Sequence, residues 1–317
     1  MNGHKNSSEY LKVNDDTFLH IRDWGQGTVI VFIPGWPFGH EMYEYQFTQL
    51  THRGYRCIGI SMRGFGKSSQ PWGEYSYDIF ADDLQSVLHA LDLTGVTLVG
   101  FSMGGAIALR YMARHNGDRI ANLVLCGAAA PSFTTRPGFP FGMEPGAVDR
   151  LIKLCYSDRA RLNADFSKLF FKDYTTITPQ LLDWFQSLAM EASPHATGAC
   201  LALLRDADLR EDIHSVKVPT ILFHGVHDRI CPFKLSEIMT LPTEIMPAGE
   251  VAIAAGAEAI PAAEPAAGGI RGAKLIRFEN SGHALFYEER ERFNIELINF
   301  IEKKPSGEKR FFGPATR

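Results

Sequence analysis

The sequence has few cysteines, no long hydrophobic run and no excess of positive charge. Its five cysteines are scattered along 317 residues and form no C-x-x-C pair, which excludes a disulfide framework or a cysteine-rich zinc module. No apolar stretch reaches the roughly 20 residues that a membrane-spanning helix needs. The formal net charge of −4 provides no basic surface for nucleic acid or anionic lipid. We therefore expect a protein that binds neither nucleic acid nor membrane.

The cysteines and the N-terminus also bear on location. Residues 1–12 are polar and contain no apolar signal core, and an odd number of unpaired thiols suits a reducing compartment. Cys57 and Cys126 lie inside apolar runs and are expected to be small core residues. Together these features predict a cytoplasmic protein.

Short apolar runs alternate with helix-length amphipathic stretches, a pattern typical of a mostly parallel sheet covered by helices on both faces. Turn residues at 14–16 separate the first two runs, which predicts an N-terminal hairpin. The sequence thus predicts an α/β fold with an eight-stranded sheet. The expected strands are 10–13, 17–22, 29–33, 56–60, 96–101, 120–126, 220–224 and 274–278, and the expected helices are 42–53, 78–91, 103–114, 288–301 and one that starts near Phe233.

Strand signals vanish between Ala130 and Val216, and aromatic residues become frequent there. We interpret 131–216 as a helical cap inserted into an α/β core of residues 1–130 and 217–304. Most of its aromatics should pack the cap on the core, and a subset should line a pocket below it. They are Phe133, Phe139, Phe141, Phe170, Phe171, Tyr174, Trp184 and Phe185. An Ala/Pro/Gly-rich insertion at 247–269 and a flexible tail at 305–317 complete the predicted organisation.

The segment Gly100-Phe101-Ser102-Met103-Gly104 matches the pattern G-x-S-x-G. It follows the apolar run Val96 to Val99 and precedes a helical stretch that begins at Gly105. A tight strand-to-helix turn at this place strains the backbone and raises the serine hydroxyl above the sheet, at a helix N-terminus that favours developing negative charge. Ser102 is the predicted nucleophile.

Two further residues complete a catalytic set in the chain order Ser, Asp, His. Asp228 follows the strand 220–224, and His283 follows the strand 274–278. A serine hydroxyl needs a base to take its proton, and the imidazolium that forms needs a carboxylate to orient and stabilise it. We predict His283 as the base and Asp228 as its partner. Asp206, Asp208 and Asp212 are rivals upstream, on the cap side of the strand, and should point elsewhere.

The reaction also needs donors for a tetrahedral oxyanion. One is expected from the backbone N–H of Met103, directly after the nucleophile. The other is expected from the N–H of Trp36 in Pro34-Gly35-Trp36-Pro37, because Pro37 has no N–H. Phe38 and Phe101, with these two residues, suggest an apolar acyl pocket.

Several of these segments together resemble one family. The Pro34–Pro37 loop, Met62–Ser68, Gly100–Gly105, His224–Asp228 and Gly282-His283 resemble the α/β-hydrolases, and within them the cofactor-free haloperoxidase, arylesterase and perhydrolase group. The resemblance implies a metal-free carboxylic ester hydrolase, often able to make peracids from a carboxylic acid and hydrogen peroxide.

The resemblance is incomplete at three places. The family usually has His where this chain has Pro34, which alters the hydrogen bonding of the oxyanion loop. It usually has Asp where this chain has Ser61, which bears on loop support. The 247–269 insertion has no recognised counterpart.

The favoured function is a serine carboxylesterase that works through an acyl-enzyme on a small-molecule ester, with perhydrolysis as a secondary activity. No His, Cys or Asp cluster has metal-ligand spacing in the sequence, so neither metal nor cofactor is expected. The alternatives are a lactonase or a carbon–carbon bond hydrolase with the same triad, or a non-catalytic small-molecule receptor on the same fold. Ser102 argues against dehalogenases and epoxide hydrolases, which use an aspartate nucleophile. The natural substrate, its acyl length and the oligomeric state are not readable from the sequence.

Overall fold

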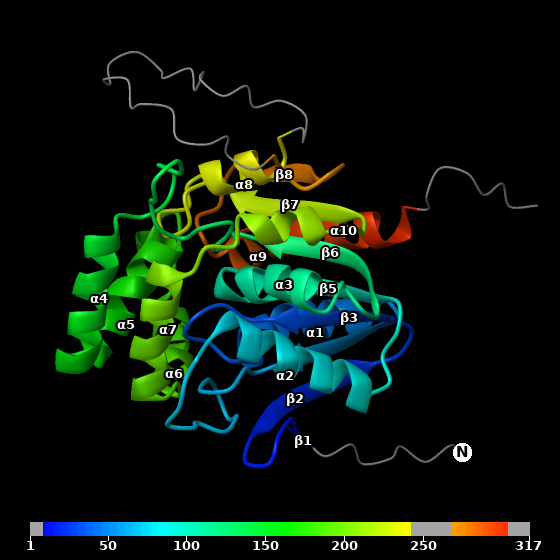
Figure 1. The fold of residues 1–317 in the computed structure, drawn as a ribbon, viewed down its shortest axis with the longest axis horizontal. Coiled ribbons are helices and arrows are strands. Elements are labelled where there is room, and N and C mark those ends of the chain that lie inside the picture. The colour runs from blue at the N-terminus through cyan, green and yellow to red at the C-terminus, as the bar shows by residue number, and fades with distance from the viewer. Residues whose placement is uncertain (1–8, 242–267, 304–317) are drawn as a thin grey trace, which may run out of the picture.

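A single eight-stranded sheet organises the part of the chain described by the computed structural model, residues 9–241 and 268–303. The strands lie side by side in the order β1-β2-β4-β3-β5-β6-β7-β8 (Figure 1). Their bounds are β1 (Tyr10–Lys12), β2 (Phe18–Gly25), β3 (Thr28–Ile33), β4 (Tyr55–Ile60), β5 (Val96–Phe101), β6 (Ile120–Cys126), β7 (Thr220–Gly225) and β8 (Lys274–Phe278). These strands confirm the predicted sheet.

Only the N-terminal hairpin departs from parallel pairing. β1 pairs antiparallel with β2, and β2 pairs antiparallel with β4, whereas every later pair in the sheet is parallel. At the centre, Val31 of β3 lies opposite Ile58 of β4 and Leu98 of β5. All residues of β5 are buried, as expected for a parallel strand covered on both faces.

Helices cover the two faces of the sheet. α2 (Tyr77–Ala90) packs on α3 (Met103–Arg114), and α1 (Glu44–Thr51) packs on α10 (Arg290–Glu302) on the opposite face (Figure 1). The predicted helix 42–53 is instead a 3-10 turn, η1 (His40–Tyr43), followed by α1. The predicted helix 288–301 is divided at Glu289, whose ψ of 46° separates α9 (Leu285–Glu288) from α10. The helix expected near Phe233 is α8 (Lys234–Met239).

The cap lies between β6 and β7 and gathers at one end of the sheet (Figure 1). Prolines stand in the first turn of α4, α6 and α7, where a missing N–H costs nothing. The helices of the cap are α4 (Pro145–Ser157), α5 (Arg159–Phe170), α6 (Pro179–Met190) and α7 (Pro194–Asp206), and its 3-10 turns are η2 (Tyr174–Thr176) and η3 (Glu211–Ser215). The helical cap inserted between two strands is therefore confirmed.

Aromatic packing joins the cap to the core. The ring of Phe170, at the end of α5, lies 5.5 Å from that of Phe38 and 5.9 Å from that of Phe101. The backbone contributes as well, because the N–H of Ser193 donates to Gly64 O at 2.8 Å. Tyr174, by contrast, is exposed, so not every aromatic in the cap serves this packing.

Some sequence predictions fall on residues outside the described part of the chain: most of the 247–269 insertion and the 305–317 tail. All five cysteines are buried and unpaired, Cys57 and Cys126 among them, as predicted. In the ranges 9–241 and 268–303, no helix combines the length and apolarity needed to cross a membrane.

Candidate active site

Ser102 occupies the tight turn between β5 and α3. Its φ of 53° and ψ of −120° place it in a strained region of backbone space, which a non-glycine residue adopts only when its surroundings impose it. Two glycines near Ser102 lie so close to neighbouring atoms that no larger residue would fit. A Cβ at Gly100 would lie 2.5 Å from Gly104 O, and one at Gly105 would lie 2.6 Å from the Cβ of Ala128.

Asp228 and His283 meet beyond the carboxyl ends of β7 and β8. His283 Nδ1 and Asp228 Oδ2 are 2.6 Å apart, and both side chains are fully buried. Gly127, at the end of the neighbouring β6, has a φ of 46°, and a Cβ there would lie 3.3 Å from both of these atoms. Three adjacent strand ends thus converge on the pair, as parallel strands require.

The carboxylate of Asp228 is held on both oxygens. Its Oδ1 accepts from the backbone N–H groups of Ile230 and Cys231 at 2.8 and 2.9 Å. Its Oδ2 faces His224 Nε2 at 3.2 Å in addition to His283. Burial alone would raise the pKa of Asp228, but the two imidazoles outweigh it and hold the pKa well below its usual range. Asp228 is therefore ionised at neutral pH.

His224 contacts Asp228, and the sequence alone did not single out this residue. Its Nδ1 lies 2.6 Å from Ser236 Oγ, and its Nε2 lies 2.9 Å from Cys231 O. A carbonyl oxygen can only accept a hydrogen bond, so the imidazole proton of His224 is on Nε2. The same N–H group also faces the carboxylate of Asp228. The signal was its position on β7, four residues before Asp228.

Ser102 and His283 are not hydrogen-bonded to each other in this structure. His283 Nε2 is buried and has no hydrogen-bond partner, while Ser102 Oγ contacts Cys231 Sγ at 4.0 Å. Catalytic hydrogen bonds are often unformed without substrate and tighten in the complex. Burial raises the pKa of Cys231 well above its usual value, so its thiol is uncharged and a poor nucleophile.

The loop 34–37 lies directly against Ser102. A Cβ at Gly35 would lie 2.8 Å from the Cβ of Ser102, so only glycine allows this approach. The indole Nε1 of Trp36 donates to Thr197 O of α7 at 3.1 Å, which ties the loop to the cap. Met103 is the first residue of α3, where a backbone N–H has no acceptor within the helix.

The two predicted pocket residues take different positions. Phe101 packs its ring 4.6 Å from the imidazole of His283 and 5.0 Å from the ring of Phe286, so it helps to fix this imidazole in place. Phe38 packs on the cap rings Phe170 and Phe185. Phe170 also approaches His283 at 5.5 Å, a contact that only the folded cap reveals. That Phe38 and Phe101 contact an acyl group stays a prediction.

The rival aspartates lie away from this site, as predicted. Asp206 pairs with Arg205, Asp208 pairs with Arg210, and Asp212 pairs with Arg110 of α3 at 3.2 Å. Asp212 is buried, and its Oδ2 has no hydrogen-bond partner. Burial raises the pKa of Asp212 to about 6.

This shift makes stability depend on pH. A carboxyl whose pKa is higher in the folded state favours folding when protonated, so its contribution is lost as pH rises from about 4 to 6. Relative to Asp212→Asn, the wild type should lose roughly 2–3 kcal/mol of unfolding free energy over that interval. Urea unfolding at pH 4 to 7 measures this, with Asp206→Asn as the surface control. Parallel stability curves for wild type and Asp212→Asn would contradict it.

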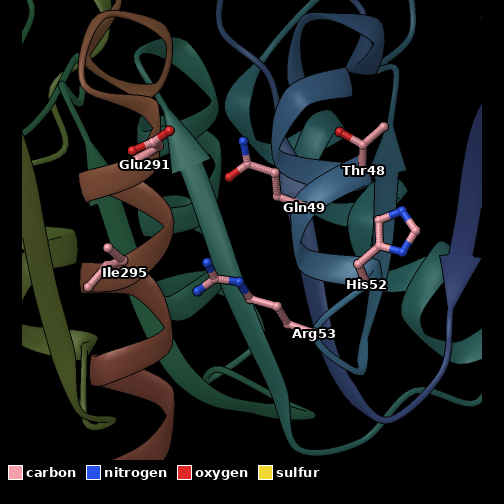
Figure 2. A pocket seen from close by; sticks show the side chains of 6 residues that line it. All are labelled: Thr48, Gln49, His52, Arg53, Glu291 and Ile295. Carbon is pink, nitrogen blue, oxygen red and sulfur yellow. The ribbon is translucent and has the colours of Figure 1, made fainter.

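A separate groove of about 480 Å³ opens between α1 and α10. Figure 2 shows its lining side chains, which come from these two helices and the turn that follows α1: Thr48, Gln49, His52, Arg53, Glu291 and Ile295. It is lined by none of Ser102, Asp228 and His283, so it is separate from the candidate active site.

Within residues 9–241 and 268–303, folding also brings together one set of residues with metal-ligating side chains, which their spacing in the sequence did not reveal. Ligand atoms of His20, His40 and Glu41 lie within 4.8 Å of one another. His20 comes from β2, and the other two come from η1.

Residues 28–242 match the family model described as the alpha/beta hydrolase fold. Together with the sheet order and the strand–serine–helix turn, this match shows that the chain belongs to the α/β-hydrolase family.

The chain is similar along nearly its whole length to several members of that family. It is 41% identical to the AB hydrolase superfamily protein YisY of Bacillus subtilis over 92% of this chain and 98% of that protein. An esterase from Exiguobacterium antarcticum superimposes with a TM-score of 0.81 and 37% identity, covering 93% of this chain and 99% of that one. A bromoperoxidase from Bacillus anthracis gives a TM-score of 0.81 and 30% identity over the same shares.

Proposed function

We propose that this protein is a serine carboxylic ester hydrolase that acts through an acyl-enzyme on Ser102. The observation that carries the proposal is the orientation of His283. Its Nδ1 is engaged by the ionised Asp228 at 2.6 Å, while its buried Nε2 has no partner. A neutral imidazole held in this tautomer has a free lone pair on Nε2, as a general base needs.

The reaction follows from that arrangement. Rotation of the Ser102 side chain brings Oγ to Nε2, which takes its proton as Oγ attacks the ester carbonyl. The N–H groups of Met103 and Trp36 stabilise the oxyanion. The C–O bond to the alcohol breaks as Nε2 returns the proton to the leaving oxygen. Water then attacks the acyl carbonyl while Nε2 takes its proton. The bond to Ser102 Oγ breaks as Nε2 returns the proton to Oγ, which frees the acid and restores the enzyme. The similarity to the esterase from Exiguobacterium antarcticum supports this class of reaction.

Perhydrolysis is the second candidate, favoured by the similarity to the bromoperoxidase from Bacillus anthracis. Hydrogen peroxide is nearly as small as water, so it can attack the same acyl-enzyme and release a peracid. Water is far more concentrated, so this remains the minor route.

The test of hydrolysis is a panel of p-nitrophenyl esters of increasing acyl length, run beside a lactone and an amide. The test of perhydrolysis is the bromination of monochlorodimedone in the presence of acetate, peroxide and bromide. We expect ester turnover far above that of the amide, and slow bromination that requires Ser102 and His283. Faster turnover of the lactone than of every ester would favour a lactonase. Bromination that is equal in wild type and Ser102→Ala would show that the enzyme has no part in it.

A further inference from the structure

His20, His40 and Glu41 form a cluster that has no role in the proposed reaction. Four of its polar atoms are buried without a hydrogen-bond partner: His20 Nδ1, His40 Nε2 and both carboxylate oxygens of Glu41. Leaving such groups unpaired is costly, and most of all for a carboxylate. So many orphaned atoms around one point indicate that a cation belongs among them.

The distance between His20 and Glu41 suits two ligands of one metal ion better than a direct hydrogen bond. His20 Nδ1 lies 3.4 Å from Glu41 Oε1, and one ligand atom of each of the three side chains lies within 4.8 Å of the other two. A charge-assisted hydrogen bond is about 2.7–2.9 Å long. Two ligands of a tetrahedral zinc ion, each bound at about 2.0–2.2 Å, lie roughly 3.3–3.6 Å apart.

The surroundings hold these side chains in place. Ser61 Oγ accepts from the backbone N–H of His40 at 3.0 Å and contacts its Nδ1 at 2.7 Å, which leaves Nε2 as the free ring nitrogen. Metal-bound histidines are commonly fixed in this way through the other ring nitrogen. A Cβ at Gly39 would lie 2.5 Å from Glu41 Oε2, so this glycine keeps room for the carboxylate. The backbone N–H of His20 is bonded to Ser68 Oγ at 2.8 Å.

We propose that His20, His40 and Glu41 form a structural site for a divalent transition metal of the zinc type. Two imidazoles and a carboxylate form a donor set that zinc binds well, with water as a fourth ligand. The ion would fasten β2 to η1, and η1 begins three residues after the oxyanion loop ends at Pro37. It stabilises the fold and takes no part in the bond-breaking steps.

The experiment uses the full chain without a histidine tag, stripped with a chelator and titrated with zinc ions in a calorimeter. We expect about one ion per chain and a melting temperature that rises with zinc by mass action. Glu41→Gln and His20→Ala should each weaken binding at least ~100-fold, since loss of a ligand costs no less than loss of its support. His52→Ala, at an exposed histidine of the α1–α10 groove, is the matched control and should bind as wild type does.

A second measurement on the wild type does not depend on how the variants fold. Cobalt(II) added to the stripped protein should give the strong visible absorption of a tetrahedral site, and zinc should abolish it. Absence of binding, an octahedral cobalt spectrum, or binding that survives Glu41→Gln and disappears in His52→Ala would overturn the proposal. A melting temperature that responds to pH and not to zinc would show that a proton fills the place of the ion. Ester turnover by stripped, folded protein is the separate check on the proposed function.

Discussion

Ser102→Ala is expected to lower kcat on p-nitrophenyl acetate by about 10⁵-fold or more, because the oxyanion hole and binding alone supply only a small part of a triad's rate enhancement. The change removes one oxygen atom and leaves the strained turn, with its φ of 53°, imposed by the packing of its neighbours. The fold should therefore survive, which circular dichroism and the melting temperature check.

The matched control is Cys231→Ala. It removes the sulfur that lies 4.0 Å from Ser102 Oγ, yet its uncharged thiol has no place in the reaction. Turnover should stay within about tenfold of wild type, because of Ser102 and Cys231 only Ser102 forms a bond in the transition state. Activity of Ser102→Ala within the same range would refute the assignment of the nucleophile.

Asp228→Asn is expected to lower kcat by about 10⁴-fold through the tautomer of His283. The backbone N–H groups of Ile230 and Cys231 both point at the Oδ1 position, so the amide oxygen of the asparagine must lie there. Its NH2 group then faces His283 Nδ1, which has to accept. The imidazole proton moves to Nε2, and no base remains for Ser102.

Stopped-flow or steady-state assays across pH measure this loss, and Asp208→Asn is the control. Asp208 is paired with Arg210 at 2.7 Å outside the site, so its amide variant should keep its turnover. If Asp228→Asn retained turnover close to that of wild type, another carboxylate would have to orient His283.

The proposed triad could be predicted from sequence because each member stands next to a strand end. Parallel strands bring their carboxyl ends to one edge, so Asp228 and His283 meet although more than 50 residues separate them. The same rule placed Gly127 and the loop 34–37 beside them. Local pattern was therefore enough for the fold and for the residues proposed to react.

Other parts of the site depend on contacts that no periodicity records. Phe170 reaches His283 only because the cap folds back on the sheet, and which cap aromatic does so is decided by packing. His20 meets His40 and Glu41 because an antiparallel strand runs beside a 3-10 turn, where the strand-end rule gives no information. The break at Glu289 likewise reflects its carboxylate accepting from Ser281 Oγ and Asn280 N.

The junction between cap and base limits how this enzyme could be re-engineered. The N–H of Ala284 donates to Phe170 O at 2.9 Å, and Glu288 accepts from Lys172 N and Gly282 N, both at 2.7 Å. The loop that carries His283 is therefore held partly by main-chain atoms of the cap. A chimera that exchanged all of 131–216 for another lid would also remove this support. Grafts that keep 170–172 would change the rest of the cap and leave His283 in its present position.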